Sequence, residues 1–264
     1  MKILVCVKMV PDTSEAEVKV DKGGKGIADA GFKYDINEAD NYAVEEAMLI
    51  QEARGGEVKV LSIANADADV MLRMALAKGG ESAMRLDDPR VNGKNPVQVA
   101  KALAGMIKGE EFDLILTGCM SSDDKNMSTG VALAEELGVS HAAMVKKVDV
   151  AEDGSKVTVQ RELEGGLLEV SEVKLPAVLT IQTGINVPRY APVRELRKAM
   201  KKELKVVKLE DLGIAEDVMN EAGSKVELER YFIPKVESNV ILLEGSPDET
   251  AEQLAFKMIK GGLM

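Results

Sequence analysis

The first 140 residues alternate short runs of β-branched and aliphatic residues with longer stretches in which apolar side chains recur every three or four positions. Strands that alternate with helices of this length are joined by right-handed crossovers and form a parallel sheet with helices on both faces. The predicted strands span residues 2–8, 58–63, 83–86 and 112–118, and the predicted helices span 38–53, 67–78, 96–107 and 127–137. The pattern therefore predicts a doubly wound α/β fold with a mostly parallel, Rossmann-like sheet.

Beyond residue 140 the rhythm changes to apolar and polar residues in alternation around an Asp-Gly and a Gly-Gly turn, which is typical of antiparallel hairpins. The four strand-like stretches span residues 144–150, 155–163, 167–173 and 176–183. A glycine-rich excursion (18–31) interrupts the first crossover, and a segment without a clear period (209–245) precedes a terminal helix (248–259). We expect a nucleotide-binding domain with its antiparallel extension over 1–205 and an extended arm with a helix over 206–264.

The composition is that of a globular protein with an acidic surface. The net charge is −11, with 45% hydrophobic residues, no Trp, four Tyr and four Phe. Few aromatics argue against a single-stranded nucleic-acid binder, which stacks bases on aromatic rings. Apolar runs stay well short of the roughly 20 residues of a membrane span, and Met1 is followed at once by a strand-like run, so we expect a cytoplasmic protein that does not span a membrane.

Side chains that could carry catalysis or hold a metal are scarce. The chain has two cysteines, Cys6 and Cys119, which we interpret as small buried hydrophobes, and a single histidine, His141. Glu45 and Glu46 are adjacent on a predicted helix, so they point about 100° apart and form no catalytic pair. We interpret them as part of a solvated face, and we predict neither a catalytic residue nor a metal site.

The loop after the fourth predicted strand is the richest candidate for a ligand site. Ligands of doubly wound sheets bind at the carboxyl ends of the strands where the strand order reverses, which brings together Cys6–Lys8, the turn after 58–63 and residues 118–138. Gly118 permits close approach of the backbone, and Ser128 and Thr129 with the free amides of the next helix make an anion site. Asp123 and Asp124 could accept hydrogen bonds from ribose hydroxyls.

Two observations keep that interpretation open. Ser, Asp and Asn also cap helices by default, and both the Walker A motif and the Gly-x-Gly-x-x-Gly fingerprint are missing. Simple ATP hydrolysis and simple NAD binding are therefore disfavoured.

Residues 186–208 form a basic segment on this acidic chain. Eight basic and two acidic residues between 189 and 208 give +6, which leaves about −17 for the rest. A helix after Pro192 would place Val193, Leu196, Met200 and Leu204 on one face and the cations on the other. One interpretation is a surface helix with one packed stripe. As a binding surface, the segment suits an acidic protein partner better than a phosphate or membrane surface, because the surrounding charge would repel polyanions.

Several stretches together resemble the β subunit of the electron-transfer flavoprotein family over nearly the whole chain. They are "MKILVCVKMVPDT", "INEADNYAVEEA", "DLILTGCMSSDDKNMSTG", "LPAVLTIQTGINVPRYAPVRELRKAMKK" and the "DLG" after the basic segment. The resemblance implies an electron-carrier subunit rather than a stand-alone enzyme, paired with an α subunit in a heterodimer that holds FAD. Members accept electrons from acyl-CoA dehydrogenases, as in fatty acid β-oxidation, and pass them on, often to a membrane quinone oxidoreductase.

The resemblance also implies AMP as a structural ligand of the β subunit, or a second FAD that takes hydride from NADH in bifurcating members. The rival from another class is a universal-stress-type nucleotide-binding protein, which the arm and the Pro-Arg-Tyr loop disfavour. Carried over position by position, the nucleotide contacts are Cys6, Asn37, Glu38, Ala39, Asp40, Ile63, Gly118, Cys119, Met120, Ser121, Ser122, Asp123, Asp124, Lys125, Asn126, Met127, Ser128 and Thr129.

The segment from about residue 183 to 205 resembles the family's recognition loop, with Val193 where the family commonly has an anchoring leucine. The implied partner contacts are Pro188, Arg189, Tyr190, Ala191, Pro192, Val193, Arg194, Arg197 and Lys198. The nucleotide loop departs from the family at Cys119, Met120, Ser121, Lys125 and Met127. It lacks the glycine between the two acids and the Gly-Pro at the helix start of bifurcating members, which favours AMP over a second FAD.

Overall fold

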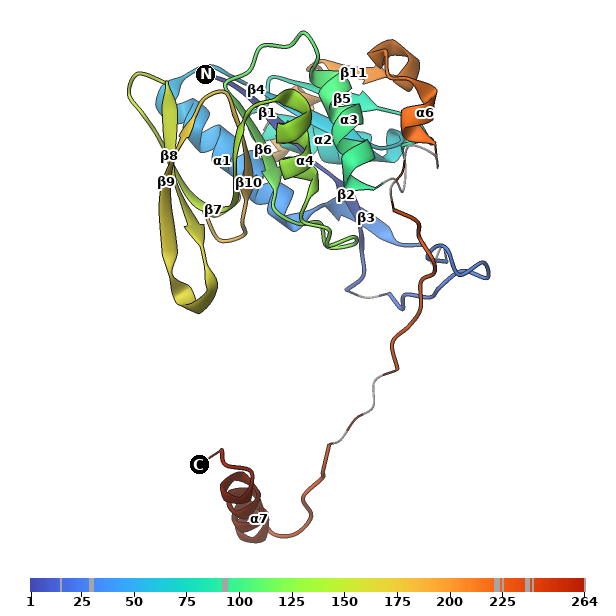
Figure 1. Ribbon diagram of the computed structural model, residues 1–264, viewed down its shortest axis with the longest axis vertical. Coiled ribbons are helices and arrows are strands. Elements are labelled where there is room, and N and C mark those ends of the chain that lie inside the picture. The colour runs from blue at the N-terminus through green and yellow to red at the C-terminus, as the bar shows by residue number, and fades with distance from the viewer. Residues whose placement is uncertain are drawn as a thin grey trace. The chain divides into compact units, whose positions relative to one another are not determined.

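β1 (Lys2–Cys6) lies inside a nine-stranded sheet with the order β11-β5-β4-β1-β6-β10-β7-β8-β9, in which the strands from β11 to β7 run parallel (Figure 1). The other bounds are β4 (Glu57–Ile63), β5 (Ser82–Leu86), β6 (Leu114–Gly118), β7 (Ser140–Val150), β8 (Lys156–Glu162), β9 (Leu168–Lys174), β10 (Ala177–Ile181) and β11 (Leu204–Val207). β8 and β9 extend the sheet antiparallel to β7. The predicted doubly wound, mostly parallel fold is confirmed.

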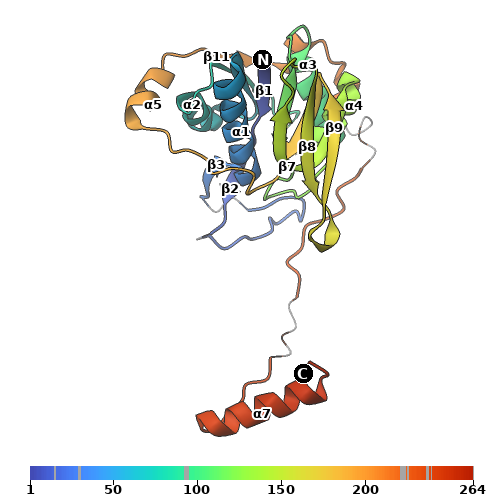
Figure 2. The ribbon, with the colours of Figure 1, turned by 90° about the vertical axis from the view of Figure 1, so that its left-hand side faces the viewer.

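The helices form a layer on each face of the sheet. Figure 2 shows α1 (Glu38–Arg54), α2 (Asp69–Ala77) and α5 (Val193–Ala199) on one side, and α3 (Pro96–Ile107) and α4 (Thr129–Leu137) on the other. Short 3-10 turns lie at Ala66–Ala68, Glu164–Gly166 and Leu209–Leu212, and α6 spans Glu216–Met219. The first four predicted helices are therefore observed, with small shifts at their ends.

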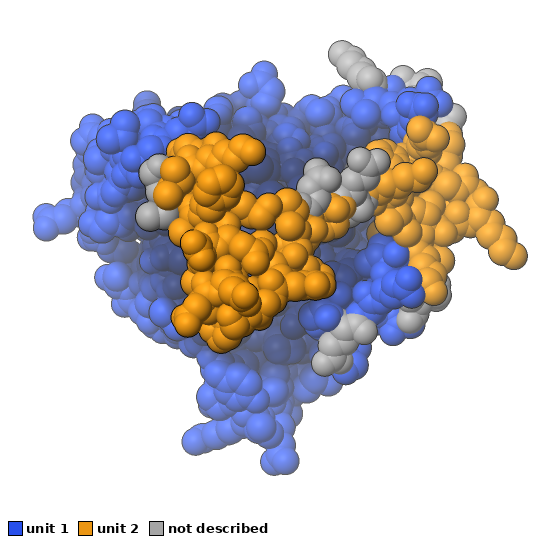
Figure 3. All heavy atoms as spheres, turned by 90° about the horizontal axis from the view of Figure 1, so that it is seen from below, with its two compact units in different colours: residues 1–18, 29–229 blue, residues 19–28, 230–264 orange. Residues whose placement is uncertain are grey.

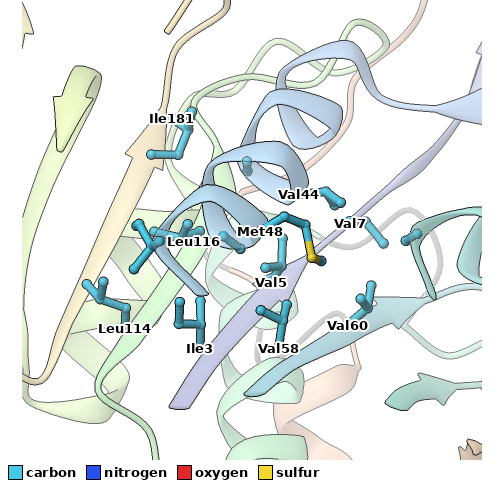
Figure 4. Close-up of a cluster of buried hydrophobic side chains, with 14 of the residues drawn as sticks. Ile3, Val5, Val7, Val44, Met48, Val58, Val60, Leu114, Leu116 and Ile181 are labelled. Carbon is cyan, nitrogen blue, oxygen red and sulfur yellow. The ribbon is translucent and has the colours of Figure 1, made fainter. Parts of the chain in front are cut away.

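Two apolar clusters fill the layers because successive side chains of a strand point to opposite faces. Val5 and Val60 face α1 and α2, whereas Leu4 and Leu61 face α3 and α4. Figure 4 shows Val44 and Met48 of α1 over the first of these sets. The sheet is covered on both faces, as parallel sheets require.

The coordinates are a computed structural model that describes residues 1–14, 16–28, 31–91, 95–220, 224, 226–235, 238 and 240–263. The chain forms two compact units, residues 1–18 with 29–229 and residues 19–28 with 230–264 (Figure 3). The first includes a two-stranded antiparallel sheet of β2 (Met9–Asp12) and β3 (Lys33–Ile36). The second includes a Val20–Ile27 bridge and the helix α7 (Pro247–Lys260), which begins with a Ser246–Glu249 capping box. Among the described residues, no helix is both long enough and apolar enough to cross a membrane.

The expected pairing of one strand was wrong. β10 was expected in an antiparallel hairpin, but it enters the sheet between β6 and β7 and runs parallel to both. Its five residues are all buried, which is typical of an interior parallel strand. The hairpin pattern therefore holds for β7, β8 and β9 only.

The basic helix is also shorter than expected. α5 ends at Ala199, Met200 is 64% exposed, and Leu204 begins β11, which pairs with β5 at the edge of the sheet. The unpaired edge of β5 offers main-chain hydrogen bonds to the β-branched Val206 and Val207, and these bonds replace the expected helical stripe.

α2 and α5 are joined by reciprocal capping. Arg73 of α2 donates to the carbonyl oxygens of Ala199 (2.8 Å) and Lys202 (2.6 Å) at the end of α5. Lys202 in turn donates from Nζ to the carbonyl oxygens of Leu76 (3.2 Å) and Gly80 (2.6 Å) at the end of α2. Each cation satisfies carbonyl groups at the end of the other helix. The ammonium of Lys202 therefore joins α2 to the segment after α5.

Candidate functional site

A cavity of about 520 Å³ lies at the carboxyl ends of β1, β4 and β6. The chain leaves β1 toward β4 on one side and later returns to β6 on the other, so this is the point where the strand order reverses. Ligands of doubly wound sheets bind at such a point, and the volume lies within the roughly 300–1,000 Å³ of small-molecule sites. The cavity is therefore the candidate site.

One buried carboxylate ties the elements at this point together. Asp40, in the first turn of α1, accepts from the backbone N–H of Lys8 at the end of β1 and of Gly118 at the end of β6, both at 2.8 Å. Burial raises the pKa of Asp40 to about 6, against the opposing effect of these two hydrogen bonds. The carboxylate thereby fixes where α1 begins relative to both strands.

Asn37 fixes the loop that follows β6. Its buried side chain makes no capping bond to α1 and reaches across to the loop. Its Nδ2 donates to the carbonyl oxygen of Met120 (2.9 Å), and its Oδ1 accepts from the backbone N–H of Ser122 (3.1 Å). The loop offers both a donor and an acceptor to this amide, so the side chain stabilises the loop and leaves the first N–H groups of α1 without a side-chain cap.

Two glycines are needed where the backbone passes close to other groups. A Cβ on Gly118 would lie 2.3 Å from Oδ1 of Asp40, and one on Gly130 would lie 2.6 Å from Oγ1 of Thr117. Gly130 lines the cavity in the first turn of α4 but was not among the predicted ligand contacts. The Thr-Gly dipeptide at the start of the predicted helix is the signal that could have identified it.

The loop ends in backbone geometry suited to an anion. Met127 has a left-handed φ of 54°, and Ser128, which makes no side-chain cap, follows with φ −125° and ψ −12°. A left-handed residue followed by a right-handed one turns successive N–H groups toward a common point. The N-terminus of α4 begins at Thr129 and adds its positive dipole end, so this part of the cavity favours a phosphate.

Lys8 links the end of β1 to the two acids of the loop. Its Nζ lies 2.6 Å from a carboxylate oxygen of Asp123 and 2.6 Å from one of Asp124. Burial alone would raise the pKa of Asp123, but hydrogen bonds from Lys8 and Ser121 together with the charge of Lys8 outweigh burial and lower the pKa. The two acids, predicted to bind ribose, hold Lys8 at the cavity, where Lys8 and Asp124 both line the wall.

Another part of the wall is mostly apolar. Its apolar residues come from the end of β4, from the segment before α3, from α3 itself and from β3, and they are Ile63, Ala64, Val91, Pro96, Val99, Leu103 and Tyr34, whereas Asn65 and Asp67 after β4 are polar. Apart from Ile63 these residues were missed, because they are ordinary strand-end and helix residues whose convergence depends on the tertiary fold. An apolar slot beside an anion site matches the chemistry of a nucleotide, a flat base joined to a phosphate.

Most of the predicted contacts lie in the cavity wall, and their binding of a nucleotide stays a prediction. The wall includes Cys6, Asn37, Asp40, Ile63, Gly118, Cys119, Met120, Ser121, Asp124, Asn126, Met127, Ser128 and Thr129. Of the predicted contacts, all within the described residues, Glu38, Ala39, Ser122, Asp123 and Lys125 are outside it.

The two cysteines show no sign of nucleophilic chemistry. Burial raises the pKa of Cys6 to about 12, and burial also raises the pKa of Cys119. Thiolates are the reactive form of cysteine, so both side chains serve as cavity wall at neutral pH.

The recognition-loop residues lie elsewhere, over α1 and α2. Val193–Ala199 form α5, and the segment before it runs past α1, where Asn186 donates to Glu46 and Arg189 to Glu45. Glu45 and Glu46 are 3% and 7% exposed. Their assignment to a solvated face was wrong because residues far along the chain supply polar partners that cover them.

Known proteins are similar to this sequence over most of its length. A family described as the electron transfer flavoprotein domain matches residues 25–212. The electron transfer flavoprotein subunit β of Methylophilus methylotrophus is 36% identical over 256 residues, 96% of both chains. The subunit β of Thermoanaerobacterium thermosaccharolyticum is 34% identical over 98% of both chains. The subunit β of Homo sapiens is also 34% identical, over 81% of this chain and 84% of the human chain.

The Asp40 bridge has a testable pH dependence. The pKa is about 3.9 in the unfolded chain and about 6 in the fold. Between these values the native state holds a proton that the unfolded state has lost, so the stability contributed by Asp40 is full below pH 4 and is lost as pH rises through 6. We expect the wild-type advantage in free energy of unfolding over Asp40→Asn to shrink by roughly 2 kcal/mol between pH 4.5 and 7.5.

Urea unfolding of both chains across this pH range measures that difference. The Asn variant is neutral at every pH, so it supplies the reference against which the titration of Asp40 is measured. A difference that is flat or grows with pH would contradict the assignment.

Proposed function

We infer that this chain, which belongs to the electron transfer flavoprotein family and matches its β subunits over nearly their full length, transfers electrons as one half of a heterodimer with an α subunit. Flavin association follows from the family, and we propose FAD as the redox group of the heterodimer. We assign this chain the role of carrier, in which it shapes one side of the flavin environment and docks partners. The universal-stress alternative loses its basis, since the family match covers residues 25–212.

We propose AMP as the ligand of the cavity. The supporting observation is the arrangement of the wall, with an apolar slot between β4 and α3 facing the anion-binding turn at Met127–Thr129. A base in the slot and a monophosphate at the start of α4 would use both parts. The polar side chains of Ser121, Asp124 and Asn126 lie in the wall and could pair with ribose hydroxyls.

The same wall supports AMP over a second FAD. One turn with left-handed geometry and one helix N-terminus suit a single phosphate, and a volume of about 520 Å³ suits a mononucleotide better than a dinucleotide with an isoalloxazine ring. Hydride transfer from NADH would also need room for that ring. AMP in this position would act structurally, by filling the cavity and joining β4, the loop and α4.

We propose that residues 183–205 dock an acyl-CoA dehydrogenase as electron donor. In support, Tyr190 is 81% exposed and Val193 is 61% exposed, and Arg194, Arg197 and Lys198 lie exposed on the adjoining helix. Such a surface suits an apolar pocket with an acidic rim. We further propose that a membrane quinone oxidoreductase accepts the electrons. Residues 206–264 are proposed to pack on the α subunit, and the proposed location is the cytoplasm.

The nucleotide content of the heterodimer tests the cofactor proposal. The chain is co-expressed with a candidate α subunit, the complex is purified and denatured, and the released nucleotides are separated and counted. We expect one FAD and one AMP for each heterodimer. Two FAD without AMP would make the cavity a second flavin site, and the absence of both nucleotides would contradict the proposed function.

The docking surface has its own test in Val193→Ala. Truncation of a packed anchor costs on the order of 1–2 kcal/mol, so we expect the reduction of the heterodimer by its dehydrogenase to slow by roughly 5- to 30-fold at limiting concentration, with unchanged AMP and FAD. The matched control is Val97→Ala, an exposed valine on α3 across the sheet from α5. Equal rates for the two variants would reject Val193 as an anchor.

A further inference from the structure

Two glutamates of α1 are buried although their helix lies at the surface of the sheet. Glu45 is 3% exposed and Glu46 is 7% exposed. Carboxylates are rarely buried to this degree unless a cation or hydrogen-bond donors compensate for the lost hydration. What covers them is the segment that precedes α5.

Arg189 binds Glu45 through its main chain and its side chain together. Its backbone N–H donates to Oε2 of Glu45 at 2.8 Å, and its Nε lies 2.9 and 3.0 Å from the two oxygens of the same carboxylate. Its Nη1 donates to Oε1 of Glu52 at 2.5 Å, about two helical turns further along α1. The guanidinium thus spans two carboxylates with the fixed fork geometry that a lysine lacks.

Asn186 makes a second attachment three residues earlier. Its Nδ2 donates to Oε2 of Glu46 at 2.9 Å and to the carbonyl oxygen of Tyr42 at 3.1 Å. Residues 186–189 are therefore fastened along one side of α1 through polar groups, of which Glu45 and Glu46 are buried and Glu52 is exposed. Hydrogen bonds from Arg189 also lower the pKa of Glu52, which is consistent with an ionised pair.

The attachments determine which side chains of the segment face outward. Val187 is 86% exposed and Tyr190 is 81% exposed, and Val193 at the start of α5 is 61% exposed, whereas Ala191 is 4% exposed. Apolar side chains of this size alternate with the residues that bind α1. We call Val187, Tyr190 and Val193 the apolar ridge.

We propose that Arg189 is a positioning residue: its grip on Glu45 and Glu52 sets the apolar ridge in place before the electron donor arrives, and the guanidinium itself does not touch that donor. The proposal deepens, and rests on, the docking function given above, and it changes the role assigned to Arg189. The occupant of the ridge is the donor protein, presenting an apolar pocket with carboxylates around it. Those carboxylates face the exposed cations of α5, Arg194 and Arg197.

The energetic reason is preorganisation. A segment that is ordered before binding loses less conformational entropy on association, so affinity rises without a new contact. Arg189 is already paired with Glu45 and Glu52 in the free chain, so its charge is not available to attract the partner. Removal of Arg189 should therefore weaken docking by loosening the ridge, and salt should affect that loss little.

Hydrogen exchange tests the positioning step in the full heterodimer, without any partner present. We expect Arg189→Met to speed exchange of the amides of residues 186–191 by roughly tenfold, and Arg189→Lys, which keeps the charge but loses the fork, to restore part of the protection. Lys108→Met, which removes an exposed charge after α3, is the control and should leave these rates unchanged. Unchanged exchange in Arg189→Met would overturn the proposal.

A second variant guards against loss of folding, since Arg189→Met leaves Glu45 buried without its counterion. Glu52→Gln alters only the outer carboxylate, which is 56% exposed, and should speed exchange of the same amides by about two- to threefold. No change in that variant, with Arg189→Met unfolded, would also overturn the proposal.

Kinetics with the acyl-CoA dehydrogenase then tests the consequence for docking. Arg189→Met should raise the KM for the heterodimer about tenfold, with kcat nearly unchanged, at low salt and at about 0.5 M salt alike. Arg194→Met should raise KM at low salt only, because a screened charge contact disappears at high salt. A KM effect of Arg189→Met that vanishes with salt, or an unchanged KM with faster exchange, would overturn the proposal.

The two levels of inference fail separately. If the dehydrogenase does not reduce the wild-type heterodimer, the proposed docking function is wrong, and the exchange rates still show whether Arg189 holds the segment. If the dehydrogenase reduces the wild type but the exchange rates do not respond to Arg189→Met, the docking function stands and the positioning role is wrong.

Discussion

The carboxylate of Asp40 is the contact on which the candidate site depends. It accepts one backbone N–H from the end of β1 and one from the end of β6, and it does so from the first turn of α1. Neighbouring parallel strands diverge beyond their last shared hydrogen bond, and a buried acceptor at that point holds the two chains together. The cavity opens at that junction, and Asn37, three residues earlier, holds the loop after β6.

A second polar junction on the same helix serves the other proposed function. Glu45 and Glu46 accept hydrogen bonds from Arg189 and Asn186, so α1 anchors the loop after β6 at its N-terminus and residues 186–189 further along. Both junctions bury carboxylates, and both spend hydration energy to fix a loop in one conformation. One helix therefore sets the geometry of the ligand cavity and of the apolar ridge.

Local sequence pattern predicted those parts of the structure that local sequence controls. The β-branched runs and helical periods of the first 140 residues predicted the crossovers, and the strand-end rule located the cavity before its shape was known. The pattern did not predict that Leu204–Val207 would leave a helix for the edge of β5, or that β10 would enter the sheet parallel. In both cases the deciding hydrogen bonds join residues far apart in the chain.

Long-range pairing also explains the misassigned side chains. Glu45 and Glu46 have the composition of a solvated face, and only the arrival of residues 186–189 makes them interior. Lys8 was expected near residues 118–138, but its pairing with Asp123 and Asp124 is seen only in the fold. The apolar wall from α3 has no motif at all, because its members share only a position in space.

The most direct measurement of the central claim is the AMP content of a heterodimer that carries Thr129→Glu. Thr129 is the first residue of α4 and lines the cavity. The helix dipole stabilises a carboxylate at this position, so α4 is retained. The same carboxylate occupies the place proposed for the phosphate and repels the phosphate by its charge. The matched control is Val70→Glu, a 70% exposed residue in the first turn of α2. The account predicts that AMP released on denaturation falls to roughly a tenth or less in Thr129→Glu and is unchanged in Val70→Glu. Full AMP content in the Thr129→Glu heterodimer would contradict it.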